Sequence, residues 1–147
     1  MAIEYSSTQE IGKSPKEVFA FLDRLENAPK WLSFCKSLKN LSGGANKTGD
    51  KLEYIYDQGG HIAQMEGVIA AHEAHSHIKL EMVDKMFQVV VKFDLEPSGD
   101  GTKFTFTSAI KPLSLMAKIL LPVVKATMPS QVKGDAEKLA RLIEATA

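Results

Sequence analysis

The order of patterns along the chain predicts an α+β fold in which a curved antiparallel sheet grips one long C-terminal helix. Three observations support this prediction. A strand pattern and two short helical patterns come first, a run of alternating strands joined by short turns comes next, and a long apolar helical pattern ends the chain. Such a fold leaves space between sheet and helix, and a space of this kind usually holds a small apolar molecule.

The first part of the chain predicts one strand followed by two short helices. Residues 3–11 alternate between two faces, as expected of a half-buried strand. Ser14 is followed by Pro15, and Glu17 comes three residues after Ser14, which together predict a capped helix start. Residues 27–34 predict a second short helix.

The middle of the chain predicts an antiparallel meander with one apolar and one polar face. Large apolar side chains recur at every second residue, and turn-forming residues separate these runs. The strongest hairpin signal is the run from Ser98 to Gly101, which reads Ser-Gly-Asp-Gly. The predicted strands cover residues 51–57, 61–69, 78–83, 87–95 and 103–110.

The last third of the chain predicts a helix that packs on the sheet. Apolar residues from Leu113 to Ile143 recur at intervals of three and four. Pro122 and Pro129 each remove a helical hydrogen bond, and Gly134 adds a further weak point, so we expect the helix to bend or break. Two compatible explanations stay open. A bent helix leaves the mouth of a cavity, or the prolines separate a short helix from the terminal one.

Composition indicates a single domain, residues 1–147, without preference for a polyanion. The 18 basic and 18 acidic residues give a formal net charge of zero, which argues against nucleic acid as the main partner. The single cysteine, Cys35, excludes an internal disulfide and fits a reducing compartment. The chain opens without a signal-peptide pattern, and its longest apolar stretch, residues 116–124, is far shorter than a membrane span. We expect a cytoplasmic protein without stable membrane insertion, either a monomer or a homodimer.

The chain resembles the START-like, helix-grip superfamily (SRPBCC), which includes polyketide cyclase/dehydratase-like proteins, lipid-transfer domains and plant pathogenesis-related allergens. The resemblance covers nearly the whole chain and is specific for fold rather than for function. The residues that carry it are Ile11, Ser14, Pro15, Val18, Phe19, Phe21 and Leu22, then Asn27 and Trp31, Gly49 and Asp50, and the run Gly101, Thr102, Lys103 and Phe104 before the last strand.

This resemblance implies a seven-stranded sheet around the terminal helix and a tunnel-like cavity between them. Aromatic and methionine side chains form adaptable walls for apolar ligands, although each residue is also a plain core candidate. The implied walls are Tyr5, Phe21, Trp31, Phe34, Tyr54, Tyr56, Met65, Ile69, Leu80, Met82, Phe87, Val89, Val91, Phe104, Phe106, Met116, Leu120 and Val124.

Few residues suggest catalysis or metal binding. His72, His75 and His77 have the spacing of a metal cluster, but exposed histidines at a turn explain them better, and we expect neither a metal nor a cofactor. Cys35 follows an apolar segment and is expected to be a small buried thiol. The polar groups expected in the cavity are Ser7, Gln9, Tyr54, Tyr56 and Ser108, with Gln64 or Glu66 there if that strand has the opposite register.

Three functions follow from these patterns. The first is binding or transport of a small hydrophobic molecule, such as a lipid, an isoprenoid or a polyketide, without catalysis. The second is a polyketide cyclase/dehydratase-type enzyme that uses Tyr54 with Tyr56 or Glu66 as acid or base. The third is a protein-interaction module, which an exposed apolar patch on the helix or on the outer sheet face would indicate.

Overall fold

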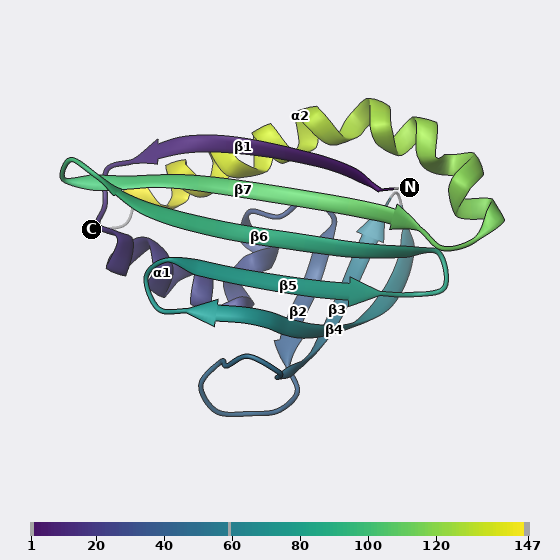
Figure 1. Ribbon diagram of the computed structural model, residues 1–147, viewed down its shortest axis with the longest axis horizontal. Helices are drawn as coiled ribbons and strands as arrows, with labels where there is room; N and C mark the ends of the chain where they lie inside the picture. Colours follow the sequence, from purple (N-terminus) through teal and green to yellow (C-terminus); the bar gives the residue numbers. More distant parts are fainter. Residues whose placement is uncertain (1, 59, 146–147) are drawn as a thin grey trace.

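The computed structural model describes residues 2–58 and 60–145 of the chain. Within them, one seven-stranded antiparallel sheet curves around a long terminal helix, which confirms the predicted fold class (Figure 1). The strands are β1 (Ile3–Ile11), β2 (Cys35–Asn40), β3 (Lys51–Gln58), β4 (His61–Glu73), β5 (His77–Val83), β6 (Phe87–Ser98) and β7 (Gly101–Pro112). The helices are α1 (Pro15–Asp23), the 3-10 helix η1 (Leu25–Lys30) and α2 (Leu115–Ala145).

The strand order places the first and the last strand of the chain side by side. The order is β1-β7-β6-β5-β4-β3-β2, so β1 pairs with β7 and the remaining strands follow as a meander. The pairing of β1 with β7 runs from Ile3 opposite Ile110 to Ile11 opposite Thr102. Helix α2 packs on β1 and β7, and it therefore covers the inner face at this edge of the sheet (Figure 1).

The predicted start of α1 is confirmed at atomic detail. The backbone N–H of Glu17 donates to the Ser14 hydroxyl at 3.2 Å, and the Ser14 backbone N–H donates to the Glu17 carboxylate at 3.3 Å. Pro15 occupies the first turn, where its missing N–H costs no hydrogen bond. This reciprocal cap fixes the point at which the chain leaves β1.

The prediction for residues 27–34 is partly wrong. The helical segment is η1 and ends at Lys30, and a strand that the pattern did not indicate, β2, begins at Cys35. The register of β2 against β3 shifts between Cys35 and Ser37, so the buried residues Cys35 and Leu38 are three apart rather than two. This bulge hides the alternation by which a strand is recognised.

Helix α2 is continuous through both prolines, so the prediction that they separate two helices is wrong. Its axis curves over the sheet, as the alternative of a bent helix requires (Figure 1). Pro122 and Pro129 free the carbonyl groups of Lys118 and Lys125, four residues earlier. The helix nevertheless continues past both prolines and bends, as helices that contain proline commonly do.

The core lies between the inner face of the sheet, helix α1 and the second half of α2. Trp31 makes edge-to-face contacts with Phe93 and Phe106, with ring centroids 5.4 and 5.2 Å apart. From α2, Met128, Val132 and several later residues are buried, whereas Ala117 alone is buried among the helix residues before Met128. The first half of α2 is therefore held to the sheet by few apolar contacts.

Replacing Gly134 by alanine is expected to raise the free energy of unfolding by about 0.5–1 kcal/mol, because glycine loses more backbone entropy in a helix. Gly134 is exposed within α2, and an added Cβ would meet no neighbouring side chain or strand within 4 Å. Urea unfolding of the two proteins measures the difference.

Gly101 supplies the opposite control for this prediction. There an added Cβ would clash with the backbone carbonyl of Ile11, so Gly101→Ala should destabilise the protein. A Gly134→Ala variant that is as unstable as Gly101→Ala would contradict a regular helix at Gly134.

Candidate functional site

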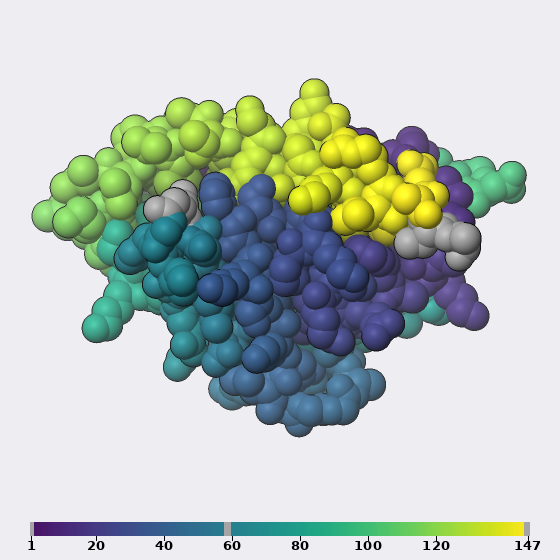
Figure 2. Space-filling model, turned by 180° about the vertical axis from the view of Figure 1, so that it is seen from behind, coloured from purple at the N-terminus to yellow at the C-terminus, as the bar shows by residue number. Residues whose placement is uncertain are grey.

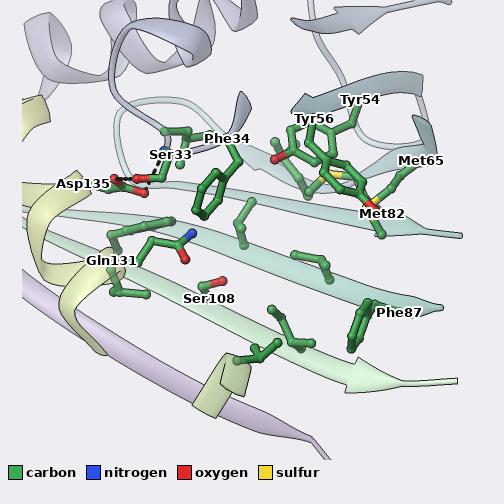
Figure 3. A pocket seen from close by; sticks show the side chains of 18 of the residues that line it. Ser33, Phe34, Tyr54, Tyr56, Met65, Met82, Phe87, Ser108, Gln131 and Asp135 are labelled. Atoms are coloured by element: carbon green, nitrogen blue, oxygen red, sulfur yellow. Dashed lines mark hydrogen bonds between the residues drawn. The ribbon is translucent and has the colours of Figure 1, made fainter. Parts of the chain in front are cut away.

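A cavity of about 170 Å³ lies between the inner face of the sheet and α2. It is open at one side, and most of its wall comes from alternate residues of β3 to β7 because successive side chains of a strand point to opposite faces (Figure 3). The predicted wall residues that line it are Phe34, Tyr54, Tyr56, Met65, Leu80, Met82, Phe87, Val89, Val91, Phe106 and Val124.

Seven predicted wall residues lie elsewhere. Trp31, Ile69 and Phe104 are buried in the solid core, where the Trp31 ring contacts Phe104 and also Phe106 of the cavity wall. Tyr5 and Phe21 are partly buried against this core. Met116 and Leu120 are exposed, because they lie on a different side of α2 from the buried Ala117. Periodicity marks these residues as apolar but does not say which space they adjoin.

Several lining residues were not predicted as part of the cavity. Ser108 was among the expected polar groups and does line it, whereas Ser7 and Gln9 are not among its lining residues. The unpredicted lining residues are Leu32, Ser33, Leu38, Ile110, Thr127, Gln131, Val132 and Asp135. The most consequential of them is Asp135, since it brings a carboxyl group into a mostly apolar space.

Asp135 projects from α2 at one end of the cavity and is only 5% exposed. Its carboxylate accepts a hydrogen bond from the Ser33 hydroxyl at 2.6 Å and another from the Ser33 backbone N–H at 3.0 Å (Figure 3). Burial raises the pKa of Asp135, and the two bonds from Ser33 offset part of this effect. The sequence held a signal for this residue, because Asp135 falls on the apolar stripe between Val132 and Leu139.

Tyr54 and Tyr56 lie at the other end of the cavity, on β3. Their rings stack with centroids 5.9 Å apart, and the Tyr56 hydroxyl donates to the Asp84 carboxylate at 3.3 Å. Burial raises the pKa of Tyr54 strongly and that of Tyr56 to a lesser degree, so both phenols keep their protons at neutral pH. They are hydrogen-bond donors rather than bases.

Phe34 lies between these two polar ends (Figure 3). It is 44% exposed and has a backbone φ of 66°, in the left-handed region that a bulky residue rarely adopts. Its carbonyl accepts a hydrogen bond from the Asp57 N–H at 2.8 Å, which holds this turn against β3. The turn from η1 into β2 therefore aims an aromatic ring into the open side of the cavity.

Glu66 does not belong to the cavity. It is exposed on the opposite face of the sheet, in a separate groove with Lys51 and Glu81. The predicted register of β4 is thus correct, and the alternative register that would have turned Glu66 inward is wrong. A carboxylate there cannot reach a molecule held beside Tyr54.

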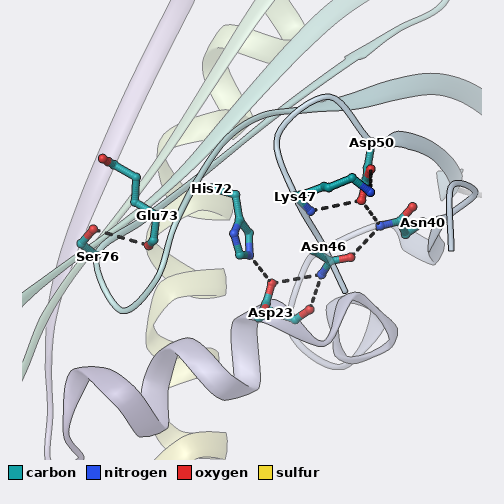
Figure 4. Close-up of polar contacts among 8 residues, drawn as sticks. All are labelled: Asp23, Asn40, Asn46, Lys47, Asp50, His72, Glu73 and Ser76. Atoms are coloured by element: carbon teal, nitrogen blue, oxygen red, sulfur yellow. Dashed lines mark hydrogen bonds and ion pairs between the residues drawn. The ribbon is translucent and has the colours of Figure 1, made fainter. Parts of the chain in front are cut away.

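The three histidines are held by separate partners. His72 Nε2 lies 2.8 Å from the Asp23 carboxylate (Figure 4). His77 Nδ1 lies 2.6 Å from the Asp94 carboxylate. Only His75 sits in the turn, so the prediction that all three are exposed turn residues is wrong for the other two. Among the described residues, no three potential ligand groups are placed to hold a metal ion.

Cys35 is buried, as predicted. Burial raises the pKa of its thiol to about 12. The thiol is therefore protonated at neutral pH, whereas an activated cysteine nucleophile is a thiolate.

The raised pKa of Asp135 predicts a particular dependence of stability on pH. Native Asp135 keeps its proton to a higher pH than the unfolded chain, whose carboxyl titrates near 3.8. Between these two values the native state binds more protons, so this group's contribution to the free energy of unfolding falls as pH rises. The measurement is urea unfolding of the wild type and Asp135→Asn between about pH 4 and pH 7. The wild-type value minus the variant value should fall with rising pH, and a rising difference would contradict the assigned environment of Asp135.

Comparison with known families identifies the fold's relatives. Residues 2–147 match the family model described as polyketide cyclase/dehydrase and lipid transport. The chain belongs to this family. Its architecture agrees with the START-like fold that the sequence resemblance implied.

Solved structures of similar architecture cover almost the whole chain. A protein from Thermus thermophilus has a TM-score of 0.77 at 15% identity and covers 97% of this chain and 98% of its own. A START superfamily protein from Mycobacterium smegmatis has a TM-score of 0.77 at 16% identity, with 96% and 97% covered. The Zhui aromatase/cyclase from Streptomyces sp. R1128 has a TM-score of 0.72 at 10% identity, with 99% and 98% covered. Identities this low show a shared fold alone.

No curated protein sequence matches the chain. In the part of the chain that the structure describes, no helix is long and apolar enough to cross a membrane.

Proposed function

We propose that the chain binds a small, mostly apolar molecule in the cavity between the sheet and α2, as a non-catalytic carrier or sensor. The observation that carries this proposal is the distribution of its lining groups. Most of the lining side chains are apolar and come from the sheet. The carboxyl group of Asp135 lies at one end and the phenols of Tyr54 and Tyr56 lie at the other, with Ser108 and Gln131 between them (Figure 3). This arrangement is typical of sites that bury an apolar body and orient it by a few polar contacts.

The size of the cavity limits the enclosed part of the ligand. An apolar cavity of about 150 Å³ holds one benzene molecule. The cavity here measures about 170 Å³, so it has room for one ring or a chain of similar bulk. A second fused ring or a longer chain would extend past Phe34 through the open side.

The polar ends favour a neutral head group over an anionic one. At one end, the buried carboxylate of Asp135 accepts hydrogen bonds and would repel a second carboxylate. At the other end, the phenols of Tyr54 and Tyr56 keep their protons. An alcohol or a phenol can form hydrogen bonds at both ends. A carboxylate head group would lose its hydration against the apolar wall, and Asp135 would repel it.

Titration with 2-naphthol, naphthalene and 2-naphthoate tests this proposal, with the fluorescence of Trp31, the only tryptophan, as readout. Trp31 contacts the cavity wall through Phe106. We expect 2-naphthol to bind at least about tenfold more tightly than 2-naphthoate, and Asp135→Asn to remove most of this difference. Failure of all three probes to bind would contradict the binding function. A preference for 2-naphthoate would contradict only the assigned head group.

A cyclase/dehydratase-type enzyme is the second candidate, favoured by one observation. A carboxyl group with a raised pKa and a phenol line the same cavity, and such groups can act as general acids. However, Asp135 and Tyr54 lie at opposite ends with Phe34 between them, so they do not converge on one reacting atom (Figure 3). Turnover of a poly-β-ketone that is lost in Tyr54→Phe would favour the enzyme, and turnover unchanged by it would exclude this role of Tyr54.

A further inference from the structure

Large apolar side chains stand exposed along the first half of α2, away from the cavity wall. Leu115 is 75% exposed, and Ile119 and Val123 are each 65% exposed. We call this surface the apolar ridge, and it consists of Leu113, Leu115, Met116, Ile119, Leu120 and Val123. Single exposed apolar residues are ordinary, but a contiguous set of this kind marks a surface that meets a partner.

The ridge is continuous with the cavity. Leu115, Ile119 and Val123 are four residues apart and form one row on the helix. Met116 and Leu120 form the next row, and the third member of that row, Val124, lines the cavity. Figure 2 shows the first half of α2, in green, along one edge of the molecule, where it is open to a partner. A molecule leaving the cavity beside Val124 would therefore meet the ridge.

The sequence segment that carries the ridge contains positive charges only. From Gly101 to Gly134 the sequence contains no Asp or Glu, although the whole chain is formally neutral. The charged residues of this segment are Lys103, Lys111, Lys118, Lys125 and Lys133. Lys118 and Lys125 are exposed and flank the ridge on the side away from the cavity. An apolar helix face bordered by lysines complements an anionic lipid surface.

A second copy of the chain fits this surface less well. In a two-fold symmetric contact each ridge would face its own copy, and the lysines beside it would face like charges. Since residues 101–134 contain no carboxylate, this segment has nothing to pair with them. Charge therefore favours a bilayer over self-association.

We infer that the first half of α2 docks on the surface of an anionic phospholipid bilayer. The apolar ridge enters the boundary between head groups and acyl chains, and Lys118 and Lys125 contact the lipid phosphates, with their carbon stems along the helix. Docking in this way brings Val124, which lines the cavity, next to the lipid phase. It requires no spanning helix, and it stands independently of which molecule the cavity holds.

Flotation of the purified protein with vesicles tests the inference. The vesicles contain phosphatidylcholine alone, or phosphatidylcholine and phosphatidylglycerol in a ratio of about three to one. We expect the wild type to float with the mixed vesicles and to be released by high salt. The partition coefficient of the double variant Ile119→Ser/Val123→Ser should be at least about tenfold lower than that of the wild type. The variant Lys118→Gln/Lys125→Gln should bind the mixed vesicles less tightly than the wild type does, and the phosphatidylcholine vesicles equally.

The matched control places the same change at exposed apolar residues elsewhere. Leu41 and Val83 are exposed and adjoin the groove on the opposite face of the sheet. Leu41→Ser/Val83→Ser should float like the wild type, and circular dichroism should show each variant folded. A wild type that stays unbound would overturn the inference, as would serine variants of the ridge that still float. So would sedimentation equilibrium showing a dimer that Ile119→Ser/Val123→Ser abolishes, because the occupant would then be a second copy.

Discussion

Replacing Phe106 by alanine is expected to lower the free energy of unfolding by about 3–5 kcal/mol and to change ligand affinity as well. Phe106 is 2% exposed and contacts Trp31 and Phe93, so the truncation removes a large part of the aromatic cluster. The same ring also lines the cavity, and its loss enlarges the space available to a ligand. Urea unfolding and a naphthol titration measure the two effects.

Phe104 provides the matched control for this prediction. Phe104 is fully buried and belongs to the same cluster, but it does not line the cavity. Phe104→Ala should therefore cost a similar free energy of unfolding, about 3–5 kcal/mol, with little change in affinity for a probe. Equal changes in affinity for the two variants would contradict the assignment of Phe106 to the cavity wall and of Phe104 to the solid core.

Filling the cavity should abolish binding without unfolding the protein. Ser108 projects from β7 into the cavity, and Ser108→Phe places a ring in space that is otherwise empty. We expect affinity for 2-naphthol to fall at least about 100-fold, which corresponds to about 2.7 kcal/mol. Because the ring occupies existing space, the free energy of unfolding should change by less than about 1.5 kcal/mol. Titration and urea unfolding of the same preparation measure both quantities.

The neighbouring residue on the same strand controls for the added bulk. Ala109 is next to Ser108 and points to the other face of the sheet. Ala109→Phe should bind the probe like the wild type. If Ser108→Phe still binds 2-naphthol with unchanged affinity, the probe lies outside the cavity.

Local patterns were sufficient for most of the fold. Alternation predicted β1 and β3 to β7, because these strands have one buried and one exposed face. The capping residues Ser14 and Glu17 predicted the start of α1. Strand β2 was missed because its bulge puts buried Cys35 and Leu38 three residues apart. The continuity of α2 was left open, because propensity penalises Pro122 and Pro129 but does not decide between a bend and a break.

The candidate site was less predictable than the fold. Alternation and the family resemblance together named inward residues such as Tyr54, Met82 and Phe106, and these do line the cavity. The same reasoning cannot separate a cavity wall from solid core, as Phe104 shows, or from an exposed ridge, as Leu120 shows. Asp135 was missed because one carboxylate on an apolar stripe is easily taken for an exposed residue, and its burial depends on a distant partner, Ser33.

Native mass spectrometry of protein purified without denaturant, followed by organic extraction, tests the binding function most directly. We expect an adduct in the wild type that extracts as one apolar species and is absent from Ser108→Phe. That result would also give the chemical class of the ligand. An adduct retained in full by Ser108→Phe, or a wild-type protein that carries no adduct and takes up neither naphthalene nor 2-naphthol, would contradict it.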